Sequence, residues 1–191
     1  LTEFLPISSS GHLILTREFL GINSVNGLAF DAVLQLATTL AIIVYFRKDV
    51  LSLARTFIMI LLKKPVSSEE KKLFWFVLFA TIPAVILGLL LENTMETIFR
   101  SAILVACTLL IGSVIMYLAE KRLGHHSDLS NSNSFYLGLF QSLALIPGMS
   151  RSGMTISGGL LLGLKREVAV RMSFVMAVPI LIGSGLKQFL D

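Results

Sequence analysis

The sequence predicts an all-α integral membrane protein, a polytopic helical bundle with two inverted-topology repeats that each contain a re-entrant helix-loop-helix. Of the 191 residues, 54% are hydrophobic and 15% are charged, whereas about 25% of residues are charged in soluble domains. The mean hydropathy is +0.82, and the apolar residues form long blocks. These two observations predict the membrane class, and a pair of similar polar loops predicts the repeats.

Composition also excludes other classes of protein. One cysteine and 5 prolines argue against a disulfide framework or a disordered chain, and Cys107 lies in an apolar run where packing is its expected role. The net charge of +4 comes from basic residues between apolar blocks, so we expect membrane-flanking loops and no nucleic-acid partner. Because the chain opens at Leu1 without a signal peptide, we expect a fragment cut at both ends.

Four apolar blocks are long enough to cross a bilayer, which takes about 17 to 25 helical residues. They are Phe30 to Phe46, Leu73 to Leu91, Ala102 to Ala119 and Ser173 to Leu190. A fifth block, Val50 to Leu62, is shorter and contains a charged residue, so we expect it to be interfacial or re-entrant.

Loop charges predict the orientation of these spans, because cytoplasmic loops are enriched in Lys and Arg. Residues 47–72 carry more basic than acidic groups and should be cytoplasmic, as should the loop at 120–134 and the basic residues just before the last span. Residues 92–101 have no basic excess and should be external. The basic residues of 47–72 are Arg47, Lys48, Arg55, Lys63, Lys64, Lys71 and Lys72, against Asp49, Glu69 and Glu70.

Two polar loops interrupt the apolar pattern in the same manner. One runs from Leu5 to His12 and the other from Ile146 to Gly153. With one extra residue in the second loop, the matched pairs are Pro6 with Pro147, Ser8 with Ser150, Ser9 with Arg151, Ser10 with Ser152 and Gly11 with Gly153. Each loop is followed by a short apolar stretch and then a span, which favours a duplication over two ordinary turns.

Three predicted spans separate the two loops, and an odd number inserts the two copies from opposite faces. We therefore divide the single membrane domain into a first repeat (1–46), connecting spans and cytoplasmic loops (47–134) and a second repeat (135–191). Non-helical backbone at membrane depth must be buried or line a wet cavity, so the two loops should meet in one. Helix N-termini at Gly11 and Gly153 would make that cavity an anion site.

The charged residues of the loops suggest chemistry. Arg151 is costly at membrane depth unless it meets an anion, and its fork suits phosphate. Glu3, His12 and the serines Ser8, Ser9 and Ser10 supply a carboxylate, an imidazole and hydroxyl groups. Together these groups are the parts of a phosphoryl-transfer site. The alternative is a transporter or channel for an anion or lipid phosphate built on inverted repeats.

The segments Glu3 to His12 and Pro147 to Ile156 resemble the two signature motifs of the undecaprenyl-pyrophosphate phosphatases, the bacitracin-resistance family. The resemblance implies removal of the terminal phosphate from the C55 isoprenyl pyrophosphate carrier of bacterial cell-wall synthesis, for recycling of that carrier. It implies a multi-pass protein of the bacterial plasma (inner) membrane whose site opens to the outer face. It also implies a divalent cation, Mg²⁺ or Ca²⁺. The first of the family's two motif acids would precede Leu1, and the family continues with further spans beyond Asp191.

The resemblance and the residues together give roles. Arg151 is expected to clamp the pyrophosphate with Ser150, Thr155 and the loop N–H groups, and Glu3 to bind the cation. Ser9 is the candidate nucleophile and His12 its proton shuttle, with a metal-bound water or His12 itself as rival nucleophiles. The complete expected site is catalytic Glu3, Ser9, His12 and Arg151, with substrate-binding Ser8, Ser10, Gly11, Ser150, Ser152, Gly153 and Thr155.

Other polar residues stay outside this predicted site. His125 and His126 are expected to be loop residues, and Gln141 and Asp31 either line the cavity or bridge helices. The expected partners are the isoprenyl pyrophosphate lipid and membrane lipid, and a homodimer remains an open alternative.

Overall fold

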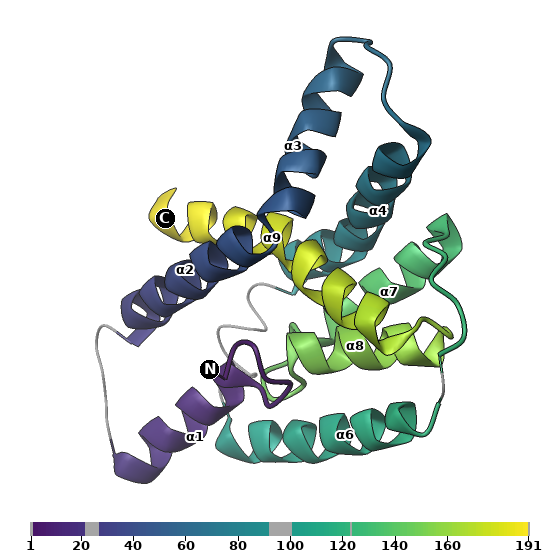
Figure 1. Ribbon diagram of the computed structural model, residues 1–191. Helices are drawn as coiled ribbons and strands as arrows, with labels where there is room; N and C mark the ends of the chain where they lie inside the picture. Colours follow the sequence, from purple (N-terminus) through teal and green to yellow (C-terminus); the bar gives the residue numbers. More distant parts are fainter. Residues whose placement is uncertain (1, 22–26, 92–100, 123, 191) are drawn as a thin grey trace.

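The computed structural model describes residues 2–21, 27–91, 101–122 and 124–190, and side chains at 27–33 and 186–190 lie outside the description. Within these ranges the secondary structure is helical, as the sequence predicts (Figure 1). In chain order the helices are α1 (Ser9–Leu20), α2 (Gly27–Tyr45), α3 (Arg47–Leu61), α4 (Ser68–Leu90), α6 (Ala102–Glu120), α7 (Asn131–Leu143), α8 (Arg151–Leu161) and α9 (Arg166–Leu190).

Among the described residues, three helices are long and apolar enough to cross a membrane. They are α4, α6 and the part of α9 from Arg166 to Gly185. Large apolar side chains lie exposed on these helices, including Leu90, Ile103 and Leu110. Such surface is unfavourable in water but suits contact with lipid tails. The helical membrane class predicted from composition is confirmed.

The helices differ from the predicted spans mainly at their first residues. α4 begins at Ser68, ahead of its apolar block, because Ser67 and Glu70 form a reciprocal capping box at its start. α9 begins at Arg166 and contains Arg166 and Arg171, two of the three basic residues expected to precede the last span, while Lys165 lies just before it. The apolar block marks the part of a helix inside the membrane, whereas the capping residues mark its end. The predicted external loop at 92–101 lies almost wholly outside the described residues.

Four helices are too short to be counted as spans. The 15-residue α3 forms an antiparallel hairpin with α4 (Figure 1), and α1, α7 and α8 have 12, 13 and 11 residues. α7 and α8 pack together on either side of the second polar loop. Whether α3 lies in the interface or enters the bilayer decides how many crossings separate the two loops, so the inversion of the repeats stays a prediction.

The buried core lies where α4, α7 and α9 meet. Its members are Phe76, Val77, Ala80, Leu137, Met172, Val175 and Met176. Gly138 of α7 lies so close to α4 that a Cβ there would come within 2.6 Å of the Ala80 carbonyl oxygen. One turn further along α7, Gln141 Nε2 donates to the same oxygen at 3.3 Å. α7 is thereby fixed against α4, and the loop that follows α7 starts from a rigid support.

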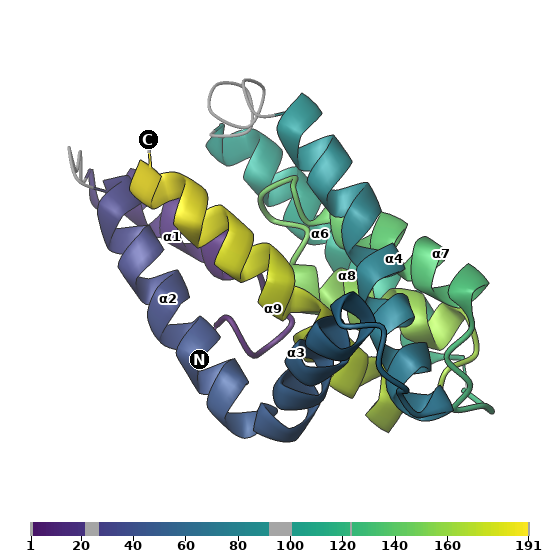
Figure 2. The same cartoon turned by 90° about the horizontal axis from the view of Figure 1, so that it is seen from above.

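Helix α8 lies in the interior, against α6, α7 and α9 (Figure 2). Two glycines allow this close packing. A Cβ on Gly158 would lie 2.5 Å from the ring of Phe140, and a Cβ on Gly159 would lie 2.7 Å from the Cβ of Ala169. The residue at the start of α8, Arg151, is therefore carried by a helix that neighbours hold on several sides.

Three ion pairs connect the segments that the sequence places on the cytoplasmic side. Lys72 pairs with Asp128, Arg166 with Glu120 and Arg171 with Asp49. The hydrogen bond from Lys72 holds the pKa of the exposed Asp128 carboxyl below its ordinary value. The segments at 47–72, 120–134 and 165–171 are thus in contact, as a common membrane face requires, while the identity of that face stays a prediction.

The loop after α6 is attached to the turn between α8 and α9. His126 Nε2 lies 3.1 Å from the Leu162 carbonyl oxygen, and the backbone N–H of Lys165 donates to the His126 carbonyl. His126 is a loop residue, as expected, but it also serves as a structural clamp on the far end of α8.

Candidate active site

The two polar loops have the same local geometry at the residues that the sequence pairs. Ser8 has φ 63° and ψ 91°, and Ser150 has φ 62° and ψ 112°. Each serine caps the helix that follows: Ser8 Oγ accepts from the Gly11 N–H at 3.3 Å, and Ser150 Oγ accepts from the Gly153 N–H at 3.2 Å. A positive φ outside glycine costs on the order of 1–3 kcal/mol and is typical of functional sites.

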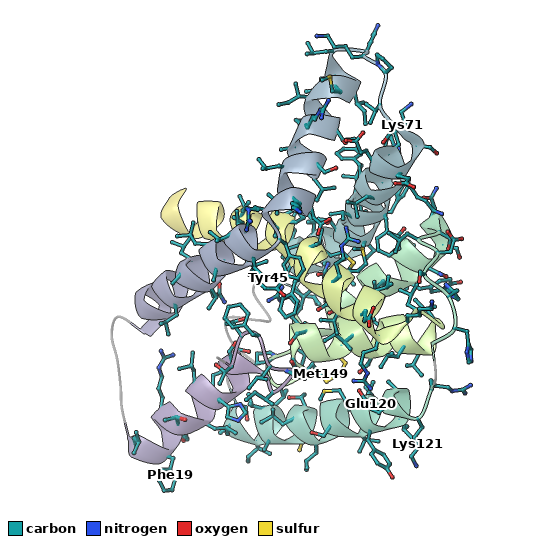
Figure 3. All side chains as sticks on the ribbon, in the orientation of Figure 1. Phe19, Tyr45, Lys71, Glu120, Lys121 and Met149 are labelled. Atoms are coloured by element: carbon teal, nitrogen blue, oxygen red, sulfur yellow. The ribbon has the colours of Figure 1, made fainter. Side chains whose placement is uncertain are left out.

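The two loops touch each other in the folded chain. A Cβ on Gly11 would lie 3.2 Å from Gly148 Cα, and Ser152 Oγ lies 3.4 Å from the Leu5 carbonyl oxygen, to which it donates. Gly148 has φ 98°, a conformation that glycine adopts readily, and it fits against α6 where larger residues would collide. Met149 beside it is buried and lies against Gly112 of α6 (Figure 3). Segments about 140 residues apart in sequence thus form one surface.

Glu3 joins the reactive residues of the two loops. Ser9 Oγ donates a hydrogen bond to Glu3 Oε1 at 2.5 Å, and Arg151 Nη2 lies 3.8 Å from Glu3 Oε2. One carboxylate therefore has the serine on one oxygen and the guanidinium near the other. This is the arrangement expected if Ser9 and Arg151 are paired positions that face each other.

A cavity of about 300 Å³ opens beside this group. Seven of the residues expected in the site line it: Glu3, Ser8, Ser9, Ser10, Ser150, Arg151 and Ser152. The other lining residues are apolar or carry amide or hydroxyl groups: Thr2, Gln35, Ala84, Gln141, Ala144, Leu145, Ile180, Leu181 and Ser184. The lining of the cavity thus combines hydroxyl and charged groups from the two loops with apolar side chains from other helices.

Arg151 has donors that the described residues leave unpaired. Its Nη1 atom is buried and has no hydrogen-bond partner among them, and its Nη2 approaches Glu3 only at 3.8 Å. A buried donor without a partner costs about 1–3 kcal/mol, and more when it carries charge. A phosphate in the cavity would supply the missing acceptors, so the guanidinium fits an anion-binding role.

The remaining expected site residues do not line the cavity. The Gly11 and Gly153 N–H groups are already bonded to the capping serines. His12 has an exposed side chain, and its Nδ1 lies 2.8 Å from the Ser8 carbonyl oxygen. Thr155 is fully buried between α8 and α9. For these four residues the catalytic or binding roles stay predictions.

The geometry gives the Ser9 proton a different acceptor from the one expected. The sequence suggests His12, three residues further along the helix, but the Ser9 hydroxyl points to Glu3 instead. The His12 nitrogen Nδ1 is bonded to the backbone of its own helix, which leaves Nε2 as the free ring nitrogen. Of the two groups, Glu3 is the one in position to act as a base on Ser9.

Glu3 is the carboxylate on the cavity that the expected cation would need. Among the described residues, no group of three or more His, Cys, Asp or Glu side chains gathers to hold a metal ion. Mg²⁺, however, is commonly held by one or two carboxylates together with substrate phosphates. Glu3 on the wall of a cavity that has room for a phosphate fits such a site in part.

Most of the other residues that line the cavity carry no signal in the sequence that marks them as site residues. The sequence predicts that Gln141 either lines the cavity or bridges helices, and the structure shows both, since Gln141 lines the cavity and its Nε2 donates to the Ala80 carbonyl of α4. Gln35 lies on α2 and Ser184 on α9, and both are distant from either motif in the sequence. The signal for Gln141 was its position in the helix that leads into the second loop, while Asp31 has a side chain outside the description.

Comparison with known proteins gives one family over the entire chain. The sequence profile described as Bacitracin resistance protein BacA matches residues 1–191. The undecaprenyl-diphosphatase of Methanosphaera stadtmanae is 40% identical over 204 residues, which cover 100% of this chain and 73% of that protein. That of Alteromonas mediterranea is 43% identical, with 100% and 72% covered, and that of Myxococcus xanthus is 43% identical, with 100% and 66% covered.

Proposed function

The chain belongs to the bacitracin resistance protein BacA family, and from that premise we propose that it hydrolyses undecaprenyl pyrophosphate to undecaprenyl phosphate and inorganic phosphate. The observation that carries the proposal is the Glu3 carboxylate with Ser9 at 2.5 Å and Arg151 at 3.8 Å. A base, a hydroxyl nucleophile and a phosphate clamp are the groups that phosphoryl transfer needs. Passage of an anion would not require the hydrogen bond between Ser9 and a carboxylate.

In the proposed first step the Ser9 oxygen attacks the terminal phosphorus. Its proton passes to Glu3 Oε1, to which it is already hydrogen-bonded. The bond between the terminal phosphorus and the bridging oxygen breaks, and undecaprenyl phosphate leaves with the electron pair. Water then cleaves the phosphoserine, releasing phosphate and restoring the Ser9 hydroxyl. Direct attack by water, or attack by His12, remains the rival to this first step.

Arg151 contributes electrostatic stabilisation in the same proposal. Its unpaired, buried Nη1 and its Nη2 face a group whose charge spreads over three equatorial oxygens during transfer. Preorganised donors in a site with little water are worth more than donors in water. The hydroxyl groups of Ser8, Ser10, Ser150 and Ser152 line the same cavity and can donate to phosphate oxygens.

A divalent cation belongs to this proposal as the expected cofactor. Glu3 would hold it together with the substrate phosphates, and the cation would neutralise charge on the transferring group.

Phosphate release is the direct test of this function. The purified complete protein, in detergent, should release phosphate from a C15 or C55 isoprenyl pyrophosphate. A chelator should abolish the turnover, and added Mg²⁺ or Ca²⁺ should restore it. Full turnover in the presence of chelator would contradict the cation role and leave Glu3 as a base alone. Absence of turnover with the cation present would contradict the proposed phosphatase activity.

We place the protein in the plasma (inner) membrane with residues 47–72 inside and the cavity open to the outer face. The basic excess of this segment and its ion pairs to the other basic segments support the assignment. Labelling of a Ser68→Cys variant in a Cys107→Ala background tests it. An impermeant thiol reagent should label position 68 only after the membrane is opened, and labelling from outside intact cells would contradict the topology.

A further inference from the structure

A pair of buried hydroxyl groups joins α8 to α9 behind the cavity. Thr155 on α8 and Ser173 on α9 are both 0% exposed, and their Oγ atoms lie 2.6 Å apart. Neither residue lines the cavity. The contact connects two helices without entering the space available to a substrate.

The direction of these hydrogen bonds follows from the protons available. Thr155 Oγ1 lies 2.8 Å from the Arg151 carbonyl oxygen, with the Ser152 carbonyl more distant at 3.3 Å. Carbonyl oxygens only accept, so the single Thr155 proton is used on the backbone of α8. Ser173 must then donate its own proton to the Thr155 oxygen. A chain of hydrogen bonds runs from Ser173 through Thr155 to the backbone of Arg151.

A second contact fixes the same two helices in register. One turn further from the cavity, Gly159 lies opposite Ala169, so close that a Cβ on the glycine would be 2.7 Å from the alanine Cβ. Thr155 opposite Ser173 and Gly159 opposite Ala169 form consecutive steps of an antiparallel pair. The close approach brings the backbones within reach of a hydroxyl-to-hydroxyl bond, and that bond acts on the first turn of α8.

We propose that Ser173 is a positioning residue for Arg151, which holds the first turn of α8 so that the guanidinium reaches the phosphate. This inference rests on the proposed function, because it needs Arg151 to contact the pyrophosphate. Ser173 lies 22 positions beyond Arg151 in the printed sequence, in an apolar helix and outside both motifs. Small displacements of a clamp can cost large factors in rate.

Loss of the Ser173 hydroxyl group should lower kcat by a modest factor. A net hydrogen bond is worth about 0.5–1.5 kcal/mol, which corresponds to a two- to twelvefold change in rate. We therefore expect Ser173→Ala to lower kcat for C15 isoprenyl pyrophosphate about three- to tenfold, with little change in KM. The matched control is Ser134→Ala, because Ser134 is also 0% exposed and bonds a backbone carbonyl at 2.6 Å in α7. Its kcat should stay within twofold of the wild type.

A conservative substitution at position 173 tests whether the hydroxyl group itself is what matters. Ser173→Thr keeps the hydroxyl group that donates to Thr155, so its kcat should return to within twofold of the wild type. If Ser173→Ala does not fold, Ser173→Cys replaces it, because the thiol keeps the volume and a weak donor. An intermediate kcat is expected for that variant, and wild-type kcat would overturn the proposal.

The outcomes distinguish this inference from the proposed function. No phosphate release by the wild type would contradict the function itself. Wild-type turnover with equal kcat for Ser173→Ala and Ser134→Ala would overturn only the positioning role of Ser173. A Ser173→Thr variant as slow as Ser173→Ala would also overturn it, since the hydroxyl group would then be present without effect.

Discussion

The two polar loops are alike at their capping serines and differ in what supports the helix behind each one. α8 buries eight of its 11 residues, among α6, α7 and α9. α1 has Gly11 as its buried residue and packs mainly on α6, and Phe19 near its end projects away from the rest of the chain (Figure 3). The same local turn is therefore carried by one interior helix and one peripheral helix.

This difference separates two ways of holding a site residue. Arg151 is held by its helix, whose backbone and neighbours are fixed on several sides. Ser9 is held by its own hydrogen bond to Glu3, because α1 supplies little packing. The comparison indicates that the clamp depends on the fold, whereas the nucleophile depends on one carboxylate.

The largest expected effect is on Arg151. Arg151→Lys keeps the charge but loses the planar fork, and loss of one preorganised donor to developing charge costs about 10²- to 10³-fold in kcat. We expect a loss of this size in phosphate release while the melting temperature in detergent stays close to that of the wild type. Near-normal turnover would contradict the clamp and with it the division of roles between the loops.

Substitutions that change the free energy of unfolding test directly how firmly α8 and α1 are packed, and we expect these effects to be smaller. Met154 and His12 follow the matched glycines Gly153 and Gly11, yet Met154 is 0% exposed and His12 is exposed. Met154→Ala should lower the free energy of unfolding by about 2–5 kcal/mol, as expected for a buried methionine.

His12→Ala is the matched substitution on α1 and should change the free energy of unfolding by less than about 1 kcal/mol. Chemical unfolding in mixed micelles measures both variants. Equal losses at the two positions would show that α1 is as firmly packed as α8, which the comparison does not allow.

Much of the fold follows from the sequence because lipid imposes a simple pattern. Apolar blocks predict α4, α6 and α9, since a backbone in hydrocarbon must satisfy its own hydrogen bonds. Their starts are less predictable, because the Ser67–Glu70 capping box lies outside the apolar block. Whether α3 lies in the interface or enters the bilayer depends on how it packs beside α4. The local sequence of α3 does not determine this packing.

The candidate site was likewise predictable from the sequence only in part. Glu3, Ser9 and Arg151 could be predicted because each carries a reactive or charged group in a matched loop or just before it. The acceptor for the Ser9 proton could not, because the choice between Glu3 and His12 depends on side-chain directions across a turn. Gln35 and Ser184 come from distant helices, so only the folded chain brings them to the cavity.

The measurement that tests the central claim most directly is a structure of the complete protein with a non-hydrolysable, methylene-bridged isoprenyl pyrophosphate bound. If the two loops form one phosphate site around Glu3, Ser9 Oγ and an Arg151 Nη atom should both lie about 3 Å from oxygens of the terminal phosphate. A pyrophosphate that contacts only one of the two loops, with Arg151 directed away from it, would contradict the account.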